Sequence, residues 1–142
     1  MTKTKALIKN QSGASVVEFA LVLPLLILIL FGIIEFALLL YNQQVITNAT
    51  REGTRLGIIV KVPRVTNQEI TDEIKKYAQK HLITFGSDTL EDDHIVITSA
   101  GTTFGSDLTV DVNYNYDFLV LSIPWFGFNQ KTLKAVSTMR ME

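Results

Sequence analysis

One long apolar run constrains this chain more than any other feature. Residues 19–41 carry a single charged side chain, Glu35. At about 1.5 Å per residue, a helix over this run would be roughly 35 Å long, enough to cross a hydrocarbon core of about 30 Å. The run is too long for the apolar part of an ordinary cleaved signal peptide, and it is apolar on all sides. The sequence therefore predicts one transmembrane helix over about 19–41.

The charges that flank this run predict its orientation. Three lysines precede it, and the segment before Glu18 contains no acid. Beyond it, Arg51 and Glu52 begin a region in which the two signs mix. Lysines close to the end of a membrane helix stay in the cytoplasm. We therefore expect a single-pass protein of the cytoplasmic membrane, with its N-terminus inside and residues 42–142 outside.

Glu18 is an acid at the edge of the apolar run, which is a costly position unless the carboxylate is solvated or paired. It could simply reach the aqueous interface. Alternatively, cleavage between Gly13 and Ala14 would make Glu18 the fifth residue of the mature chain. Its carboxylate could then pair with the new ammonium group of Ala14 in a neighbouring subunit.

Glu35 poses a similar question inside the run. Its carboxyl group could reach the interface or be protonated. It could also pair with a cationic group on a partner helix in an assembled state.

Composition excludes several classes of function. The chain has 142 residues, a net charge of −1 and no cysteine, so it offers no disulfide, no thiol nucleophile and no basic surface for nucleic acid. The two histidines, His81 and His94, lack a convincing third metal ligand. The acidic segment 88–93 matches no EF-hand and is interpreted as a solvated loop, with a cation site as the alternative. Without a phosphate-binding loop or a nucleophile elbow, we expect no metal, no cofactor and no enzyme.

The helix is expected to continue beyond the membrane, to about residue 59, with a kink at Pro24. Ala49, Gly53 and Gly57 form a stripe of small residues at four-residue spacing. Such a stripe allows close approach of another backbone. We favour packing against the chain's own sheet over glycines that are merely tolerated or that face another subunit.

Residues 61–142 predict a small external domain. Thr66 and Glu69 form a capping-box pattern before a second helix over about 67–83, with Gly86 as its stop signal. A strand begins at about 95, strict alternation marks another over 108–118, and a last strand covers about 131–141. The expected fold class is α+β: a long N-terminal transmembrane helix over 14–60, a second helix and an antiparallel sheet of three to four strands.

Residues 119–128 are expected to form a loop, yet they are rich in apolar residues, including Trp125, Phe126 and Phe128. The loop could fold back over the domain's own core. It could also be a contact surface for another subunit or for the membrane interface, where tryptophan is favoured.

Three elements together resemble a known family. The lysine-bearing leader, Gly13, Glu18 and Phe19 are similar to type IV prepilins of the Flp/Tad class. The following stretch, together with residues 48–55 (NATREGTR) and residues 137–142 (STMRME), resembles the TadE-like minor pilins. The resemblance touches both ends of the chain but not residues 61–131.

The resemblance implies a leader over 1–13, cleavage by a prepilin peptidase between Gly13 and Ala14, and subunit registration by Glu18 and Phe19. It also implies a pilin-like fold and a minor pilin that takes part in Tad-type pilus assembly, with other pilins, membrane lipid and an assembly platform as partners. Adhesion and surface colonisation are family roles. The alternatives are an uncleaved signal-anchored binding module and a pseudopilin of a type II-like secretion machine.

Overall fold

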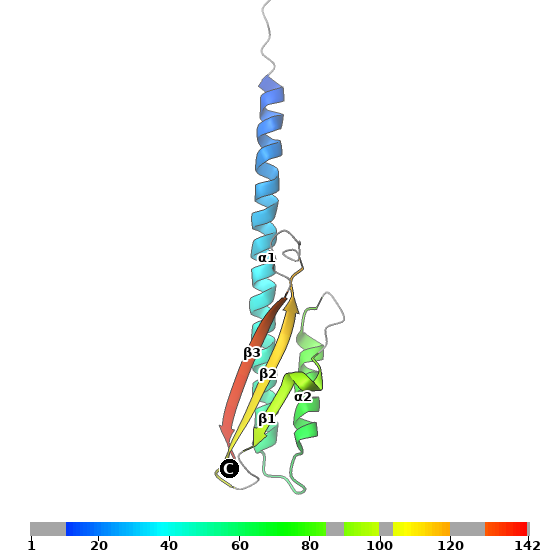
Figure 1. Cartoon of the computed structure of the whole chain (residues 1–142), viewed down its shortest axis with the longest axis vertical. Coiled ribbons are helices and arrows are strands. Elements are labelled where there is room, and N and C mark those ends of the chain that lie inside the picture. Colours follow the sequence, from blue (N-terminus) through cyan, green and yellow to red (C-terminus); the bar gives the residue numbers. More distant parts are fainter. Residues whose placement is uncertain (1–10, 85–89, 100–103, 120–129, 142) are drawn as a thin grey trace, which may run out of the picture.

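The computed structural model describes residues 11–84, 90–99, 104–119 and 130–141. A long helix carries a small domain at one end (Figure 1). The elements follow in the order α1 (Gln11–Ile58), α2 (Asn67–His81), the 3-10 helix η1 (Asp92–His94), β1 (Ile95–Ser99), β2 (Asp107–Asp117) and β3 (Gln130–Arg140). The predicted α+β class is confirmed, with a sheet of three strands in the described part of the chain.

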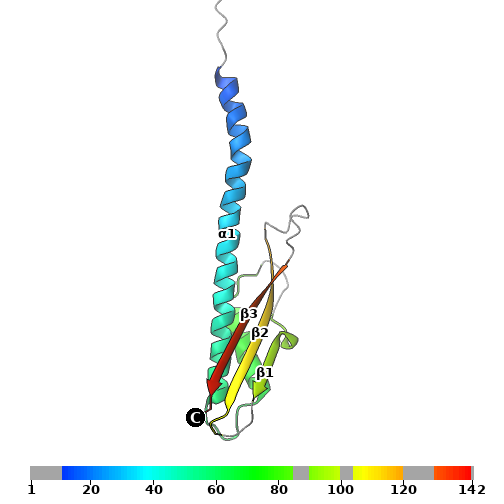
Figure 2. The same cartoon turned by 60° about the vertical axis from the view of Figure 1, so that its left-hand side comes forward.

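Helix α1 has 48 residues and is therefore about 72 Å long. Pro24 lies inside it and does not end it. The first half of α1 projects beyond the domain, and the second half lies alongside the sheet (Figures 1 and 2). The helix ends at Ile58, one residue before the predicted position.

The sheet is antiparallel in the order β1-β2-β3. In β2, every second side chain from Leu108 to Tyr116 is buried, so the predicted alternation is confirmed. Val112 is paired with Ile95 on one side and with Ala135 on the other. Helix α1 packs against β2, β3 and α2, and the buried faces of these elements meet in one apolar core.

Helix α2 begins with the capping box that the sequence predicts. The Thr66 hydroxyl accepts a hydrogen bond from the Glu69 backbone N–H at 3.2 Å, and the Thr66 N–H donates to the Glu69 carboxylate at 2.7 Å. Ile70, Ile74 and Ala78 face the core, as expected. The helix ends at His81; Gly86, the predicted stop signal, lies outside the described residues.

Candidate functional site

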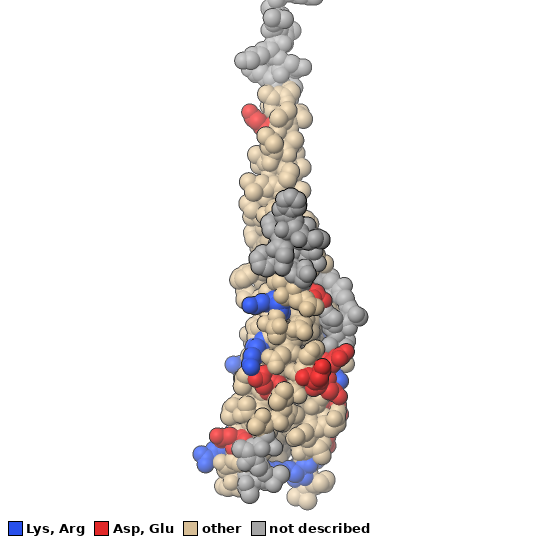
Figure 3. All heavy atoms as spheres, in the orientation of Figure 1, with Lys and Arg blue, Asp and Glu red and all other residues tan. Residues whose placement is uncertain are grey.

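The exposed first half of α1 is the most unusual surface of the molecule. Every residue from 14 to 34 is exposed except Gly32, which is half-buried. We call residues 14–34 the bare half of α1; Figure 3 shows it as an almost uncharged rod. It is about 31 Å long, close to the thickness of a bilayer core. By length and composition, α1 is able to cross a membrane, and its most apolar window is 0% buried in the structure.

The predicted cleavage and registration residues lie at the start of the bare half. Gly13, Ala14, Glu18 and Phe19 are all exposed on α1. A Cβ atom added at Gly13 would meet nothing within 4 Å. The structure thus leaves this segment accessible on the single chain, and the roles of the four residues stay predictions.

Glu35 is the first buried residue of α1, with 1% of its surface exposed. Its carboxylate accepts hydrogen bonds from the Tyr116 hydroxyl at 2.8 Å and from the Leu119 backbone N–H at 3.0 Å. Burial, and then the hydrogen bond to Glu35, raise the pKa of Tyr116. From the sequence, the Glu35 carboxyl group could reach water at the interface, be protonated, or pair with a cation of a partner helix. In the structure, its hydrogen-bond donors come from its own chain, at and just after the end of β2.

This contact changes the interpretation of residues 35–41, which the sequence assigned to the membrane. Leu38 and Leu39 pack against the domain core, and Asn42 is fully buried. The domain therefore covers one side of α1 from Glu35 onward. We call residues 35–58 the packed half of α1. The surface that is apolar on all sides ends at Ile34, before the predicted boundary at Tyr41.

Polar side chains that follow Glu35 along α1 form hydrogen bonds between the helix and the domain. The Asn42 side chain donates to the Ile83 carbonyl at 2.8 Å and accepts from the Ile83 N–H at 3.0 Å. Gln43 donates to the Lys134 carbonyl at 3.0 Å. From the sequence alone, Asn42 and Gln43 indicate only that the helix leaves the membrane and enters polar surroundings. Their partners lie 41 and 91 residues away, so no local pattern marks them as anchors.

The small-residue stripe of the packed half is buried inside the chain. A Cβ atom at Gly53 would lie 2.3 Å from Ile74 Cγ1 of α2. At Gly57 it would lie 2.4 Å from Leu108 Cδ2 of β2. Ala49 is fully buried in the same core. In the described structure, these three residues permit close packing of α1 within its own chain.

Thr50 and Thr54 stand beside this stripe, and both are buried. The Thr50 hydroxyl donates to the Ile46 carbonyl at 2.7 Å, and the Thr54 hydroxyl donates to the Thr50 carbonyl at 2.7 Å. Both hydroxyl groups are thereby satisfied within the helix, so the two threonines fit the core without an unpaired donor.

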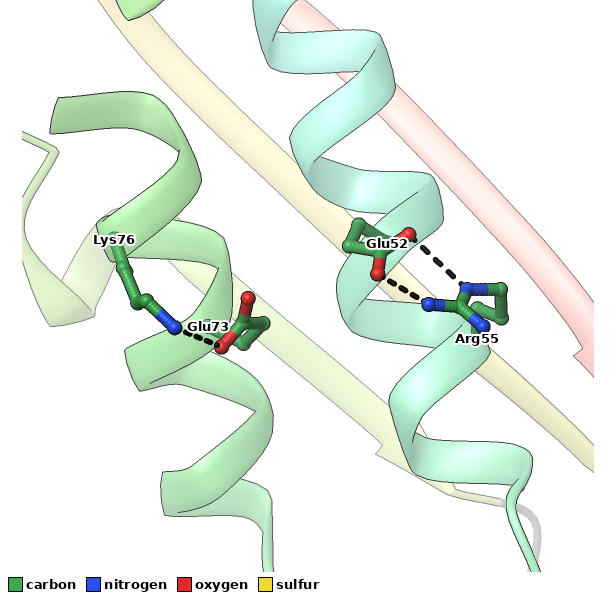
Figure 4. Close-up of polar contacts among 4 residues, drawn as sticks. All are labelled: Glu52, Arg55, Glu73 and Lys76. Atoms are coloured by element: carbon green, nitrogen blue, oxygen red, sulfur yellow. Dashed lines mark hydrogen bonds and ion pairs between the residues drawn. The ribbon is translucent and has the colours of Figure 1, made fainter. Parts of the chain in front are cut away.

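The outer side of the packed half is charged. Arg51 and Arg55 are exposed. Arg55 forms an ion pair with Glu52 one turn away, and this hydrogen bond lowers the pKa of Glu52 (Figure 4). Such exposed pairs contribute little to stability. This side of the helix faces away from the apolar core.

The remaining predicted site residues divide into two groups. Trp125, Phe126 and Phe128 lie outside the described residues, as does Asp88 of the acidic segment. Asp92 of that segment is paired with Lys75 at 2.6 Å. Within the described ranges, no group of three acidic, histidine or cysteine side chains is arranged to hold a metal ion.

Comparison with known proteins supports the TadE-like resemblance. Residues 13–55 match the family described as TadE-like protein. The match begins at Gly13 and covers the bare half, Glu35 and most of the packed half. No curated protein and no solved structure matches the chain. The chain is therefore similar to TadE-like proteins over its long N-terminal helix, the element that carries the features described above.

Proposed function

We propose that this chain is a minor pilin that takes part in the assembly of a Tad-type pilus. The observation that carries the proposal is the bare half of α1, a mainly apolar rod of bilayer length that follows Gly13 and carries Glu18 near its start. A rod that is apolar on all sides suits two environments, lipid and a bundle of similar helices. The TadE-like match over the same segment supports the association with a pilus.

In this proposal the subunit first resides in the cytoplasmic membrane with its N-terminus inside. A prepilin peptidase cleaves after Gly13. The bare half lies in the hydrocarbon core, and Glu35 lies at the outer interface, where its contacts with Tyr116 and Leu119 keep the carboxylate away from lipid. The domain then rests against the outer surface of the membrane.

During assembly the bare half exchanges lipid for the helices of neighbouring pilins. The ammonium group of Ala14 would then enter apolar surroundings, where an unpaired charge costs on the order of 3–5 kcal/mol. Glu18 is exposed one turn further along the same helix, so its carboxylate is free to neutralise the Ala14 of a neighbour.

N-terminal sequencing and the intact mass of membrane-extracted protein test this proposal. We expect the mature chain to begin at Ala14. A mature chain that retains Lys3, Lys5 and Lys9 would contradict the pilin proposal, and it would favour the uncleaved, signal-anchored binding module.

A further inference from the structure

The end of the domain that lies farthest from the bare half is built from two loops. The loop over 59–66 joins α1 to α2, and a turn at Phe104 and Gly105 precedes β2. Two backbone hydrogen bonds of 2.9 Å, Gly105 N–H to Met141 O and Met141 N–H to Ser106 O, fix this turn to the end of β3. We call residues 59–64 and Phe104 the distal tip; it lies at the lower end of the molecule in Figures 1 and 2.

Large apolar side chains protrude from the distal tip. The exposed fractions are 72% for Val60, 95% for Val62 and 86% for Phe104. No described element of the chain covers them. The packed half places them about 35 Å beyond the end of the bare half, so the bilayer that holds the bare half does not reach them. An exposed apolar group of this kind marks a contact surface.

Cations accompany these apolar groups. Lys61 and Arg64 line a shallow hollow of about 280 Å³ together with Val60 and Phe104. Arg64 is held in place by a contact of 3.1 Å to the sulfur of Met141. The loop over 59–66 contains no acid. Figure 3 shows basic side chains at this end of the molecule, together with acidic ones.

The pKa of Glu69, which follows this loop, is lowered by hydrogen bonds from Thr66 and to a smaller extent by the charge of Lys61. The Glu69 carboxylate accepts two hydrogen bonds from Thr66 in the capping box. The distal tip therefore combines protruding apolar side chains with cations. Two apolar and two cationic side chains line its hollow.

We propose that the distal tip binds the surface of a second, anionic lipid bilayer. Val62 and Phe104 enter the boundary between headgroups and acyl chains, and Lys61 and Arg64 bind the lipid phosphates. Protruding side chains can insert into the deformable interface of a bilayer, whereas a peptide partner requires a groove for its anchor residues. Charge complementarity favours anionic over zwitterionic lipid.

The test uses the full chain with its own long helix inserted in nanodiscs of phosphatidylcholine. These nanodiscs are floated with separate vesicles that contain about one-third phosphatidylglycerol. We expect the vesicles to capture the nanodiscs, and we expect Phe104→Asp and Val62→Asp to reduce capture roughly tenfold, because each places a charge where an apolar group enters the interface. Lys61→Gln should reduce it by a smaller factor, and added salt should do the same.

The matched control is Val136→Asp, because Val136 is 56% exposed on β3, away from the distal tip. It should leave capture unchanged. An equal loss in Val136→Asp and Phe104→Asp would overturn the proposal, as would capture no greater than that of empty nanodiscs, which would point to a protein partner. Equal capture by pure phosphatidylcholine vesicles would overturn the assignment to anionic lipid. None of these results depends on cleavage or pilus assembly.

Discussion

The two halves of α1 belong to one unbroken helix but face different surroundings. In the bare half, large apolar side chains such as Leu21 and Ile33 are exposed by 74% and 63%. In the packed half, Ile46 and Ala49 are completely buried. A continuous helix therefore does not reveal where lipid contact ends. The boundary is visible only where the domain begins to cover one side, at Glu35.

The halves also differ in how they treat polar groups. The bare half carries one acid, Glu18, near its start and is otherwise apolar apart from Ser15. The packed half buries Glu35, Asn42, Thr50 and Thr54, each with a hydrogen-bonded partner in the chain. Buried polar groups need such partners, and they fix the position of the domain on the helix. The comparison predicts that substitutions in one half affect assembly, and that substitutions in the other affect the domain.

The largest effect is expected at Glu18, near the start of the bare half, and Glu35, just beyond its end, is the comparison. Glu18→Gln should abolish co-purification with other pilus components, because the amide keeps the size of the side chain but cannot neutralise the Ala14 ammonium. Membrane insertion and processing should persist, since removal of a charge does not hinder insertion. Glu35→Gln should be the milder change, because an amide oxygen still accepts hydrogen bonds from Tyr116 and Leu119.

The control for this experiment is Glu52→Gln, on the exposed side of the packed half. It should co-purify as wild type does. Normal association of Glu18→Gln would show that Glu18 is only an interfacial acid, and the pairing mechanism would then be wrong.

Leucine truncation should separate the bare half from the domain core almost as clearly. Leu108→Ala removes a side chain that is 1% exposed in the core, and it should lower the free energy of unfolding by about 2–5 kcal/mol. Leu26→Ala, in the bare half, should leave domain stability unchanged, since Leu26 is 58% exposed. Urea unfolding of the reconstituted protein, followed by circular dichroism, measures both. Equal losses would mean that the bare half also packs against the domain.

A pair of glycines provides a matched test of close packing. Gly53→Ala should destabilise the domain by about 1–3 kcal/mol, because the new methyl group would overlap Ile74 and force a shift of α2. Gly32→Ala should cost the domain nothing, since a Cβ atom there meets no atom within 4 Å. The same unfolding measurement applies. A Gly53→Ala variant as stable as wild type would show that α2 can shift away from α1 at little cost in free energy.

The smallest effect is expected at the contact that marks the boundary. Tyr116→Phe removes one donor from Glu35 and should cost about 1–2 kcal/mol. Because the folded state raises the pKa of Tyr116, this contribution is complete below the ordinary tyrosine pKa of about 10 and is lost as pH rises through the folded-state pKa. The difference in unfolding free energy between wild type and Tyr116→Phe should therefore shrink in alkaline buffer. Tyr77→Phe, on α2, is the control, and a difference independent of pH would contradict the contact.

Local patterns in the sequence predicted the regular elements well. The alternation along β2 and the Thr66–Glu69 capping box are visible within a few residues, and both are confirmed. The boundary at Glu35 could not be predicted in this way. Its partners Tyr116 and Leu119 lie 81 and 84 residues away in the chain, and an isolated acid in an apolar run looks the same whether lipid or protein surrounds it.

The candidate site divides along the same line. The roles of Gly13, Ala14 and Glu18 are predicted from their spacing alone and stay predictions, whereas the anchoring role of Asn42 depends on contact with Ile83 after α2. For Gly53, the spacing indicated close packing of a backbone. The identity of the neighbour, α2 rather than the sheet, required the tertiary structure.

Cysteine scanning of α1 tests the division into halves most directly. The natural chain contains no cysteine, so each substitution between residues 16 and 58 introduces a single thiol for a nitroxide label. In lipid nanodiscs we predict high accessibility to oxygen, without helical periodicity, at every label up to Ile34. From Glu35 onward we predict a periodic pattern that is lowest at Ile46, Ala49 and Gly53. Uniform lipid accessibility that continues to Tyr41, or a periodic pattern within residues 16–34, would contradict the account.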